Sequence, residues 1–179
     1  FKCGSFVDDA LSAARTIAGD VRGVLESVID TGQVQLEQLL DFDYFEYRGH
    51  HVQKLRSIWP DLSRAPLNGF TPPKYGTAYD SLVDVRLRDL LDGHLKSNPG
   101  LRFLVLSDLN GYSPAQNSEY CKPWTGDPKV DFHSRVKRMN CDFAQVRASR
   151  MGLDWTEREP LTAGGADIRN MATVHSRKA

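Results

Sequence analysis

Residues 101–126 read LRFLVLSDLNGYSPAQNSEYCKPWTG, and this stretch decides the fold class that the sequence predicts. Its first part, Leu101 to Ser107, is almost continuously apolar, which is typical of a buried strand. Asn110-Gly111 follows as a strong hairpin signal, so we expect the chain from Tyr112 onward to form the returning strand. The stretch therefore predicts a small antiparallel sheet with aromatic and amide side chains beside it.

Helical patterns fill most of the chain before this stretch. Residues 7–29 carry apolar residues at helical spacing, and Thr31-Gly32 is a stop signal. Further helices are predicted over residues 34–45, 51–59 and 78–95. The stripe of the first helix also follows heptad spacing at Ala10, Ala14, Ile17, Val21, Val24 and Val28. Such a stripe either packs on its own domain or forms the seam of a dimer, and the pattern leaves both open.

The chain after the central stretch is predicted to return to helix and to end with one strand. Residues 125–139 and 143–150 have helical character, and residues 168–174 form the candidate strand. Helices first, then a hairpin, then more helix and a late strand indicate an α+β fold, in which helices cover a small antiparallel sheet.

Composition excludes several function classes. The 179 residues contain 23 Lys and Arg and 23 Asp and Glu, so net charge favours neither nucleic acid nor an acidic membrane as a partner. No apolar run reaches the length of a membrane span, and no signal peptide is visible. The chain begins at Phe1 rather than Met, which indicates a fragment whose membrane anchors, if any, were left out.

The motifs of catalytic and metal sites are missing or incomplete. There is no GxSxG, and residues 162–167 (TAGGAD) lack the GK[ST] of a phosphate loop. Cys121 beside Lys122 is the one candidate nucleophile, and a disulfide between Cys121 and Cys141 stays open. CxxC and CxxCH are absent, which argues against zinc ribbons and covalent haem.

One acidic and histidine-rich stretch, DFDYFEYRGHH (41–51), has the residue types of a metal site. Its conceivable ligands are Asp41, Asp43, Glu46, His50 and His51. Adjacent histidines are expected to point to different faces of a helix or strand, so we interpret the stretch as a solvated face. DLNG at 108–111 begins like a calcium loop but lacks the closing Glu, so no metal is predicted.

Three motifs carry a resemblance to a known family. They are TPPKYGTAYDSLVD (71–84), SDLNGYSPAQNSEYCKPWTGDPKVD (107–131) and SRVKRM (134–139). Together they resemble the extracytoplasmic sensor domain of a family of bacterial methyl-accepting chemotaxis proteins, over about residues 65 to 140. The resemblance implies a PAS/Cache-like antiparallel sheet with covering helices.

This sequence departs from the family pattern in two places. Gln116 stands where the family has a His, which speaks against haem ligation or pH sensing at that position. The family also continues into two further strands of a five-stranded sheet, whereas this chain offers one late strand. The sheet is therefore expected to be incomplete, rearranged, or finished by a neighbouring chain.

The resemblance implies a division of the chain and a function. Residues 1–60 would form an N-terminal helical segment able to dimerise, and residues 61–179 the PAS/Cache-like sensor domain. The expected function is non-enzymatic sensing of a small molecule in the periplasmic part of an inner-membrane chemotaxis transducer, as a homodimer, without a cofactor. The alternatives are the input domain of a histidine kinase or cyclase, a hydrolase or transferase using Cys121, a sensor with non-covalent haem, and a purely structural adaptor.

Residue types around the central stretch favour a binding pocket over a catalytic loop. Flat apolar surface and fixed hydrogen-bonding groups are typical of ligand pockets, and they occur together at Tyr112, Gln116, Asn117, Tyr120 and Trp124. Arg135, Lys137 and Arg138 offer positive charge for an anion such as a carboxylate, and Lys74 and Tyr75 would close the pocket. Each has a structural alternative, namely core packing for the aromatic residues, a turn cap for Asn117 and a solvated helix face for the basic trio.

Overall fold

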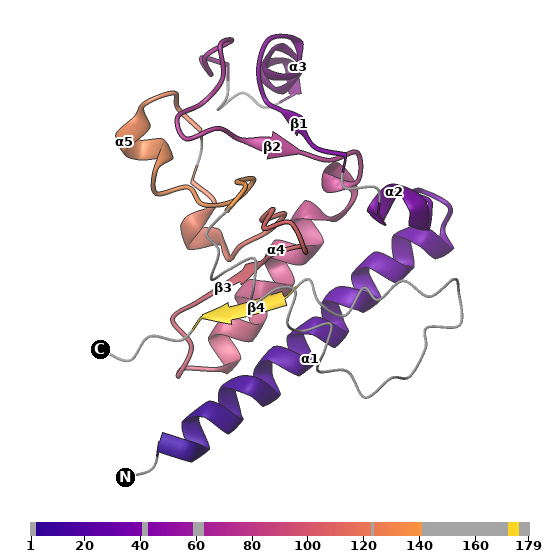
Figure 1. Cartoon of the computed structure of the whole chain (residues 1–179), viewed down its shortest axis with the longest axis vertical. Helices are drawn as coiled ribbons and strands as arrows, with labels where there is room; N and C mark the ends of the chain where they lie inside the picture. The colour runs from indigo at the N-terminus through magenta and orange to yellow at the C-terminus, as the bar shows by residue number, and fades with distance from the viewer. Residues whose placement is uncertain (1–2, 41–42, 59–62, 123, 141–171, 176–179) are drawn as a thin grey trace.

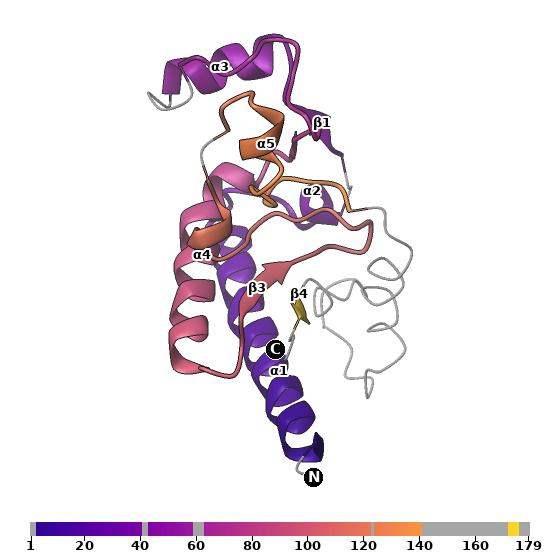
Figure 2. The ribbon, with the colours of Figure 1, turned by 90° about the vertical axis from the view of Figure 1, so that its left-hand side faces the viewer.

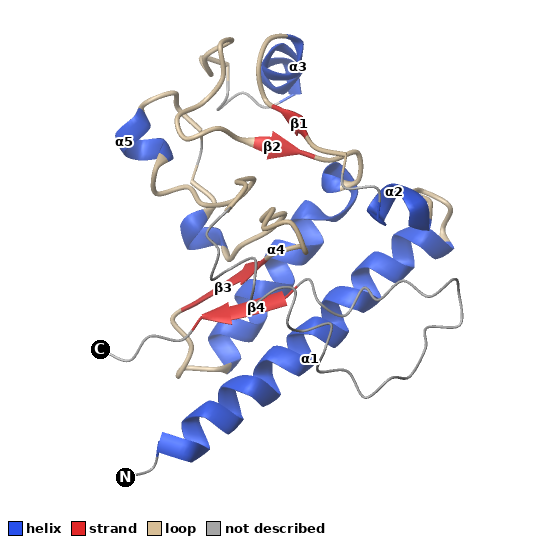
Figure 3. Ribbon diagram, viewed as in Figure 1, coloured by secondary structure: helices blue, strands red, loops and turns tan. Residues whose placement is uncertain are grey.

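The computed structural model describes residues 3–40, 43–58, 63–122, 124–140 and 172–175. In this part of the chain the fold is mixed α+β and helices dominate, as the sequence predicts (Figure 3). The helices are α1 (Cys3–Asp30), α2 (Leu36–Leu40), α3 (His50–Ile58), α4 (Asp80–Ser97), the 3-10 helix η2 (Ser118–Tyr120) and α5 (Pro128–Asp131). The strands are β1 (Phe45–Glu46), β2 (Tyr75–Gly76), β3 (Phe103–Leu106) and β4 (Ala172–His175).

The described strands form two small antiparallel sheets. β1 pairs with β2, and β3 pairs with β4 in a register that sets Phe103 opposite His175. The late strand predicted near the C-terminus is therefore present as β4, and it lies beside the apolar strand (Figure 1). The described strands alone do not establish the five-stranded PAS/Cache arrangement.

The turn predicted at Asn110-Gly111 is confirmed, whereas the returning segment from Tyr112 onward makes isolated bridges and is not a described strand. Asp108 Oδ1 accepts hydrogen bonds from the backbone N–H groups of Asn110 (2.8 Å) and Tyr112 (2.9 Å), which closes the turn. Gly111 has φ +85°, a conformation that glycine adopts without steric cost. The chain then returns along β3, because Leu106 N donates to Ala115 O at 2.9 Å.

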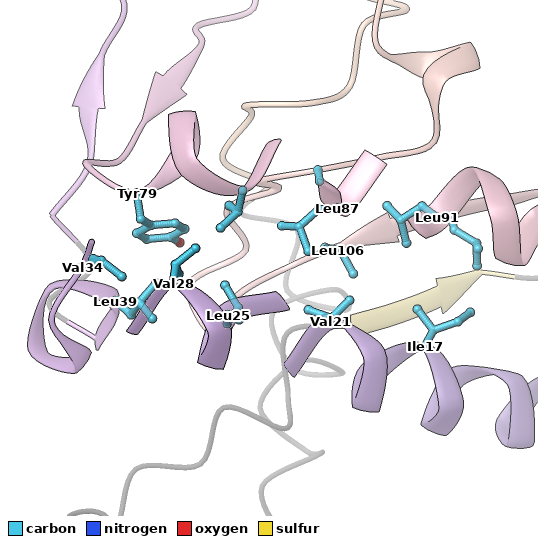
Figure 4. Packing of buried hydrophobic residues seen from close by; sticks show 13 residues of the cluster. Ile17, Val21, Leu25, Val28, Val34, Leu39, Tyr79, Leu87, Leu91 and Leu106 are labelled. Atoms are coloured by element: carbon cyan, nitrogen blue, oxygen red, sulfur yellow. The ribbon is translucent and has the colours of Figure 1, made fainter. Parts of the chain in front are cut away.

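The long helix α1 packs against α4 and runs beside the backbone of β4. Most residues of the main hydrophobic core come from α1, α2, α4 and β3. Figure 4 shows Val21 and Leu25 of α1 facing Leu87 and Leu91 of α4. The heptad stripe of α1 is thus largely used inside the chain, since Ile17, Val21 and Val28 are at most 2% exposed. Packing on its own domain therefore accounts for Ile17, Val21 and Val28 of the stripe, and the dimer stays a prediction.

The predicted stop of α1 at Thr31-Gly32 is confirmed in detail. Gly32 has φ +69°, and its N–H donates to Ile29 O at 2.8 Å. Gln33 N donates to Val28 O at 3.0 Å, which completes a Schellman motif.

The helices predicted over 51–59 and 78–95 are confirmed as α3 and α4, but two other helix predictions are wrong. The helix expected over 34–45 is limited to α2, and Phe45–Glu46 instead form strand β1. The helix expected to reach Met139 ends at Asp131, where α5 stops. The predictions for residues 143–150 and 168–171 lie outside the described residues.

The early end of α5 has a physical cause in a long-range contact. Lys74 Nζ donates to the backbone carbonyls of Ser134 and Val136, the latter at 2.7 Å. These contacts hold residues 134–136 in a non-helical conformation, and Lys137 then adopts φ +60°, which does not continue a right-handed helix. The hydrogen bonds of Lys74, which joins segments about 60 residues apart in sequence, thus override the helical pattern of residues 132–139.

A second, smaller core lies around α3, at the end of the molecule far from the N-terminus of α1 (Figure 2). Its buried residues are Val52, Ala65 and Phe70, with Tyr47 and Trp124 packed against them. Within the described residues, no helix combines the length and the apolar character that crossing a membrane requires.

Candidate ligand-binding cavity

A cavity of about 610 Å³ adjoins both hydrophobic cores. It receives side chains from β1, α3, α4 and the segments around residues 114–124 and 136–137. Its lining residues are Phe45, Tyr47, His51, Lys54, Leu55, Thr77, Ala78, Asp80, Ser81, Asp84, Arg88, Pro114, Ala115, Gln116, Cys121, Lys122, Trp124, Val136 and Lys137. Both the volume and the mixture of apolar walls with a few charged groups are typical of small-molecule sites.

One side of the cavity is an aromatic wall, which we define as Phe45, Tyr47, His51 and Trp124. Phe45 stacks on His51 with ring centroids 4.2 Å apart and an interplanar angle of 14°. Tyr47 contacts Phe45 and Trp124, with centroids 5.1 Å apart in each pair. All four rings are half-buried, so they are packed on one another and still have surface directed to the cavity.

A cluster of charged side chains forms another side of the cavity, in which Asp80 and Lys137 are buried and the side chain of Asp84 is 41% exposed. Lys137 Nζ lies 3.0 Å from Asp80 Oδ1 and 2.5 Å from Asp84 Oδ1. Asp80 Oδ2 also accepts hydrogen bonds from Tyr112 OH (2.6 Å) and from Thr77 N (2.9 Å). Burial raises the pKa of Asp84 to about 6, although the charge of Lys137 opposes that shift. The cluster is held in place from α4, the turn before it, and the segments near residues 112 and 137.

Lys74 lies behind the aromatic wall and is fully buried. Besides its two carbonyl partners, it has Ser134 Oγ at 3.3 Å, and its Nζ lies 5.2 Å from the centroid of the Trp124 ring. Burial, followed by the charge of Arg138, lowers the pKa of Lys74 to about 7. Lys74 therefore connects the segment before α4 to residues 134–136 by hydrogen bonds, and it is not among the residues that line the cavity.

Cys121 lines the cavity with a free thiol. Its Sγ–H donates to Gln116 O at 3.1 Å, and burial raises the pKa of the thiol. A raised pKa reduces the thiolate fraction at neutral pH, which is the opposite of what a cysteine nucleophile needs.

Three residues that the sequence predicts for the pocket, Gln116, Trp124 and Lys137, line the cavity. Trp124 belongs to the aromatic wall. Gln116 is 1% exposed, and its Oε1 has no hydrogen-bond partner in the part of the chain that the structure describes. Burying an acceptor without a partner costs free energy, so we expect a water that donates to Gln116 Oε1 to stabilise this side of the cavity.

The other predicted site residues are Tyr75, Tyr112, Asn117, Tyr120, Arg135 and Arg138, and none is among the lining residues. The hydroxyl group of Tyr112 donates a hydrogen bond to the lining residue Asp80, so Tyr112 contacts the cavity only indirectly. Asn117 Oδ1 accepts from Leu104 N at 3.1 Å and so fixes the returning chain to β3. Arg138 donates to Phe132 O at 3.2 Å.

Tyr75 and Tyr120, the two remaining aromatic residues among the predicted site residues, lie outside the cavity. Tyr75 is the first residue of β2, and Tyr120 packs against Phe103 with ring centroids 5.8 Å apart. Arg135 meets Tyr120 through its backbone, since Arg135 N donates to Tyr120 O at 3.2 Å.

Sequence reasoning missed the part of the cavity that comes from residues 45–55. The signal was present, because Phe45 and Tyr47 stand in an aromatic-rich stretch just before His51. The expectation that His50 and His51 point to different faces is wrong, since their ring centroids are 3.8 Å apart at the start of α3. Across the described residues, no group of three His, Cys, Asp or Glu side chains is placed to hold a metal ion.

Comparison with family models, with curated proteins and with solved structures gave no match for this chain.

Proposed function

We propose that this chain is a PAS/Cache-like, non-enzymatic sensor domain from the extracytoplasmic part of a chemotaxis transducer. The observation that carries the proposal is the cavity of about 610 Å³ with its aromatic wall and charge cluster. All three motifs that resemble the chemotaxis family contribute lining residues to it. Thr77, Asp80 and Asp84 come from the first, and Gln116, Cys121 and Trp124 come from the second. The third motif contributes Val136 and Lys137.

The helix α4 gives the proposed sensor a route from the cavity to the rest of the molecule. Asp84 and Arg88 on one face of α4 line the cavity, whereas Val83 and Leu87 are buried in the main core. A ligand that favours one position of α4 would therefore also favour one packing of α4 on α1. The size of such a signal is limited by the difference in affinity of the ligand for the two arrangements.

The state of the one candidate nucleophile supports binding over catalysis. The pKa of Cys121 is raised by burial, and its thiol is engaged with a backbone carbonyl. A hydrolase or transferase using this residue would require a lowered pKa.

A thermal-shift screen of the purified chain against organic acids, amino acids, aromatic compounds and amines tests the proposal. A ligand that binds only the folded state at 100 times its Kd adds about 2.7 kcal/mol to the free energy of unfolding. For a chain of this length that corresponds to a rise in Tm of roughly 5 to 10 °C.

A matched pair of variants on α4 shows whether a hit occupies this cavity. Ser81 is exposed and lines the cavity, so Ser81→Phe should fill part of it and abolish the Tm shift. Val85 is exposed on the same helix but outside the cavity, so Val85→Phe should leave the shift unchanged. A screen without any hit, or a hit that Ser81→Phe leaves intact, would refute the proposed function at this site.

A further inference from the structure

We infer that the ligand of this cavity is a planar aromatic anion, with an aromatic carboxylate as its simplest form. The inference rests on the proposed sensing function and adds to it the chemical class of the molecule that is sensed. It follows from two independent observations, the arrangement of the aromatic wall and the distribution of charge around the cavity.

The rings of the aromatic wall contact one another and still have surface exposed to the cavity, where a further ring can pack. The contacts run in sequence from His51 through Phe45 and Tyr47 to Trp124, and Trp124 then reaches the buried Phe70 at 5.2 Å. The wall is anchored in the smaller core at this end and stays half-buried along the cavity. A planar ring placed against it adds offset or edge contacts, which aromatic pairs provide beyond their apolar area.

The charges around the cavity favour an anion. The carboxylates among its lining residues are Asp80 and Asp84, and both lie within 3.0 Å of Lys137. Lys54, Arg88 and Lys122 supply three further positive charges from α3, α4 and the segment after η2. Arg88 has a carboxylate at 3.9 Å on the neighbouring Asp89, which is a weak surface pair.

A cationic ligand does not fit this distribution. The two carboxylates that it would need already neutralise Lys137, and the surplus positive charge of the lining residues would repel it. A purely aliphatic anion would satisfy the cations but would make no ring contacts with the aromatic wall. The combination of the two features selects a ligand with a ring at one end and an anionic group at the other.

The test compares three molecules of nearly the same shape, by titration calorimetry at pH 7. They are 3-phenylpropionate, its saturated analogue 3-cyclohexylpropionate, and the neutral 3-phenylpropionamide, with benzoate and 2-naphthoate as smaller and larger aromatic acids. Because cyclohexyl is the more hydrophobic group, preference for phenyl reports ring contacts and not burial alone. We expect the aromatic acid to bind about fivefold more tightly than the saturated acid and about tenfold more tightly than the amide.

Two variants remove the proposed charge recognition, and a third serves as their control. Arg88→Gln and Lys122→Gln should each weaken binding of 3-phenylpropionate about tenfold and leave the affinity of the amide unchanged. Arg86 is an exposed arginine on the same helix outside the cavity, so Arg86→Gln should leave both affinities unchanged.

The outcomes separate this inference from the function on which it rests. Equal binding of the phenyl and cyclohexyl acids, or of the acid and its amide, overturns the aromatic anion as the ligand class. Failure of all three aromatic acids to bind, alongside a different hit in the thermal-shift screen, overturns it too and leaves the sensing function standing. A screen with no hit of any class removes the proposed function itself.

Discussion

Lys74 is the residue whose environment departs most from that of an ordinary lysine. Its side chain is fully buried, yet among the described residues its Nζ donates only to oxygens of Ser134 and Val136. A neutral amine has two N–H donors and an ammonium has three, so the charged form suits these contacts. Burial opposes it more strongly, and the pKa of Lys74 falls to about 7.

The lowered pKa predicts a pH dependence of stability. The unfolded chain holds this proton up to a pH of about 10.5, while in the folded chain burial lowers the pKa of Lys74 to about 7. Between these values the unfolded state binds more protons, so the free energy of unfolding should rise with pH, by at most about 1.4 kcal/mol per pH unit. Below pH 7 both states are protonated, and Lys74 contributes no slope.

Urea unfolding of the wild type and of Lys74→Met at pH 7, 8, 9 and 10 measures this contribution. The wild-type free energy should rise more steeply than that of Lys74→Met, and the exposed Lys54→Met should follow the wild type. Parallel curves for wild type and Lys74→Met would contradict the prediction. If Lys74→Met does not fold, NMR titration of the Lys74 side chain in the wild type gives its pKa directly.

Single residues of the site were predictable where their surroundings are local. Gln116 and Trp124 were found because both stand in one dense stretch of amide and aromatic residues after the apolar strand. Tyr112 and Asn117 belong to the same stretch, but their side chains are engaged by Asp80 and by the backbone of Leu104. Asp80 and Leu104 are brought to these side chains by the fold, so the sequence around Tyr112 and Asn117 does not indicate either contact.

Among the elements, α1 offers the sharpest test of how glycine acts at different helix positions. Gly23 lies exposed inside the helix, and a Cβ added there meets no atom within 4 Å. Gly32 ends the helix with φ +69°, where a Cβ is strained whatever the space around it. Gly23→Ala should therefore raise the free energy of unfolding by about 0.5 to 1 kcal/mol.

Gly32→Ala is the opposite case in the same helix and should lower the free energy of unfolding by about 1 to 2 kcal/mol. Both changes are measured by the urea midpoint, with the slope of the transition as a check that the unfolded state is unaltered. Effects of the same sign at the two positions would contradict the assignment of Gly32 as the residue that ends α1.

Prediction of elements from sequence succeeded where one pattern dominates and failed where a distant contact decides. The periodicity of 78–95 and the apolar run of 101–107 were sufficient for α4 and β3. The helical pattern of 125–139 was equally visible, but Lys74 takes carbonyls in that segment and Lys137 turns to positive φ. No pattern within the segment itself indicates that contact.

The described part of the molecule has two hydrophobic cores of very different size. The larger one joins α1, α2, α4 and β3, whereas the smaller one has three buried residues around α3. Charged and hydroxyl groups lie near the boundary, including Asp80, Lys137 and Tyr112. Stability is expected to follow this division, because segments with few buried apolar contacts open at lower free energy than the main core.

Hydrogen exchange should reveal the division and its response to a ligand. In the free chain, amides of α3 should exchange faster than those of Leu87 and Leu91, which are buried in the main core. Opening of the smaller core would displace His51 and Lys54 and so destroy the cavity, which means that a bound ligand must dissociate first. At 100 times its Kd, a ligand such as 3-phenylpropionate should therefore slow exchange of the α3 amides about 100-fold.

The first turns of α1 provide the internal control for this experiment. Residues 9–14 are not buried and contribute nothing to the cavity, so local fraying there does not disturb a bound ligand. Their exchange should be the same with and without ligand, whereas that of α3 changes. Protection of α3 equal to that of α4 in the free chain would show that the two cores open as one unit, and the smaller core would then not be the part that responds first to the ligand.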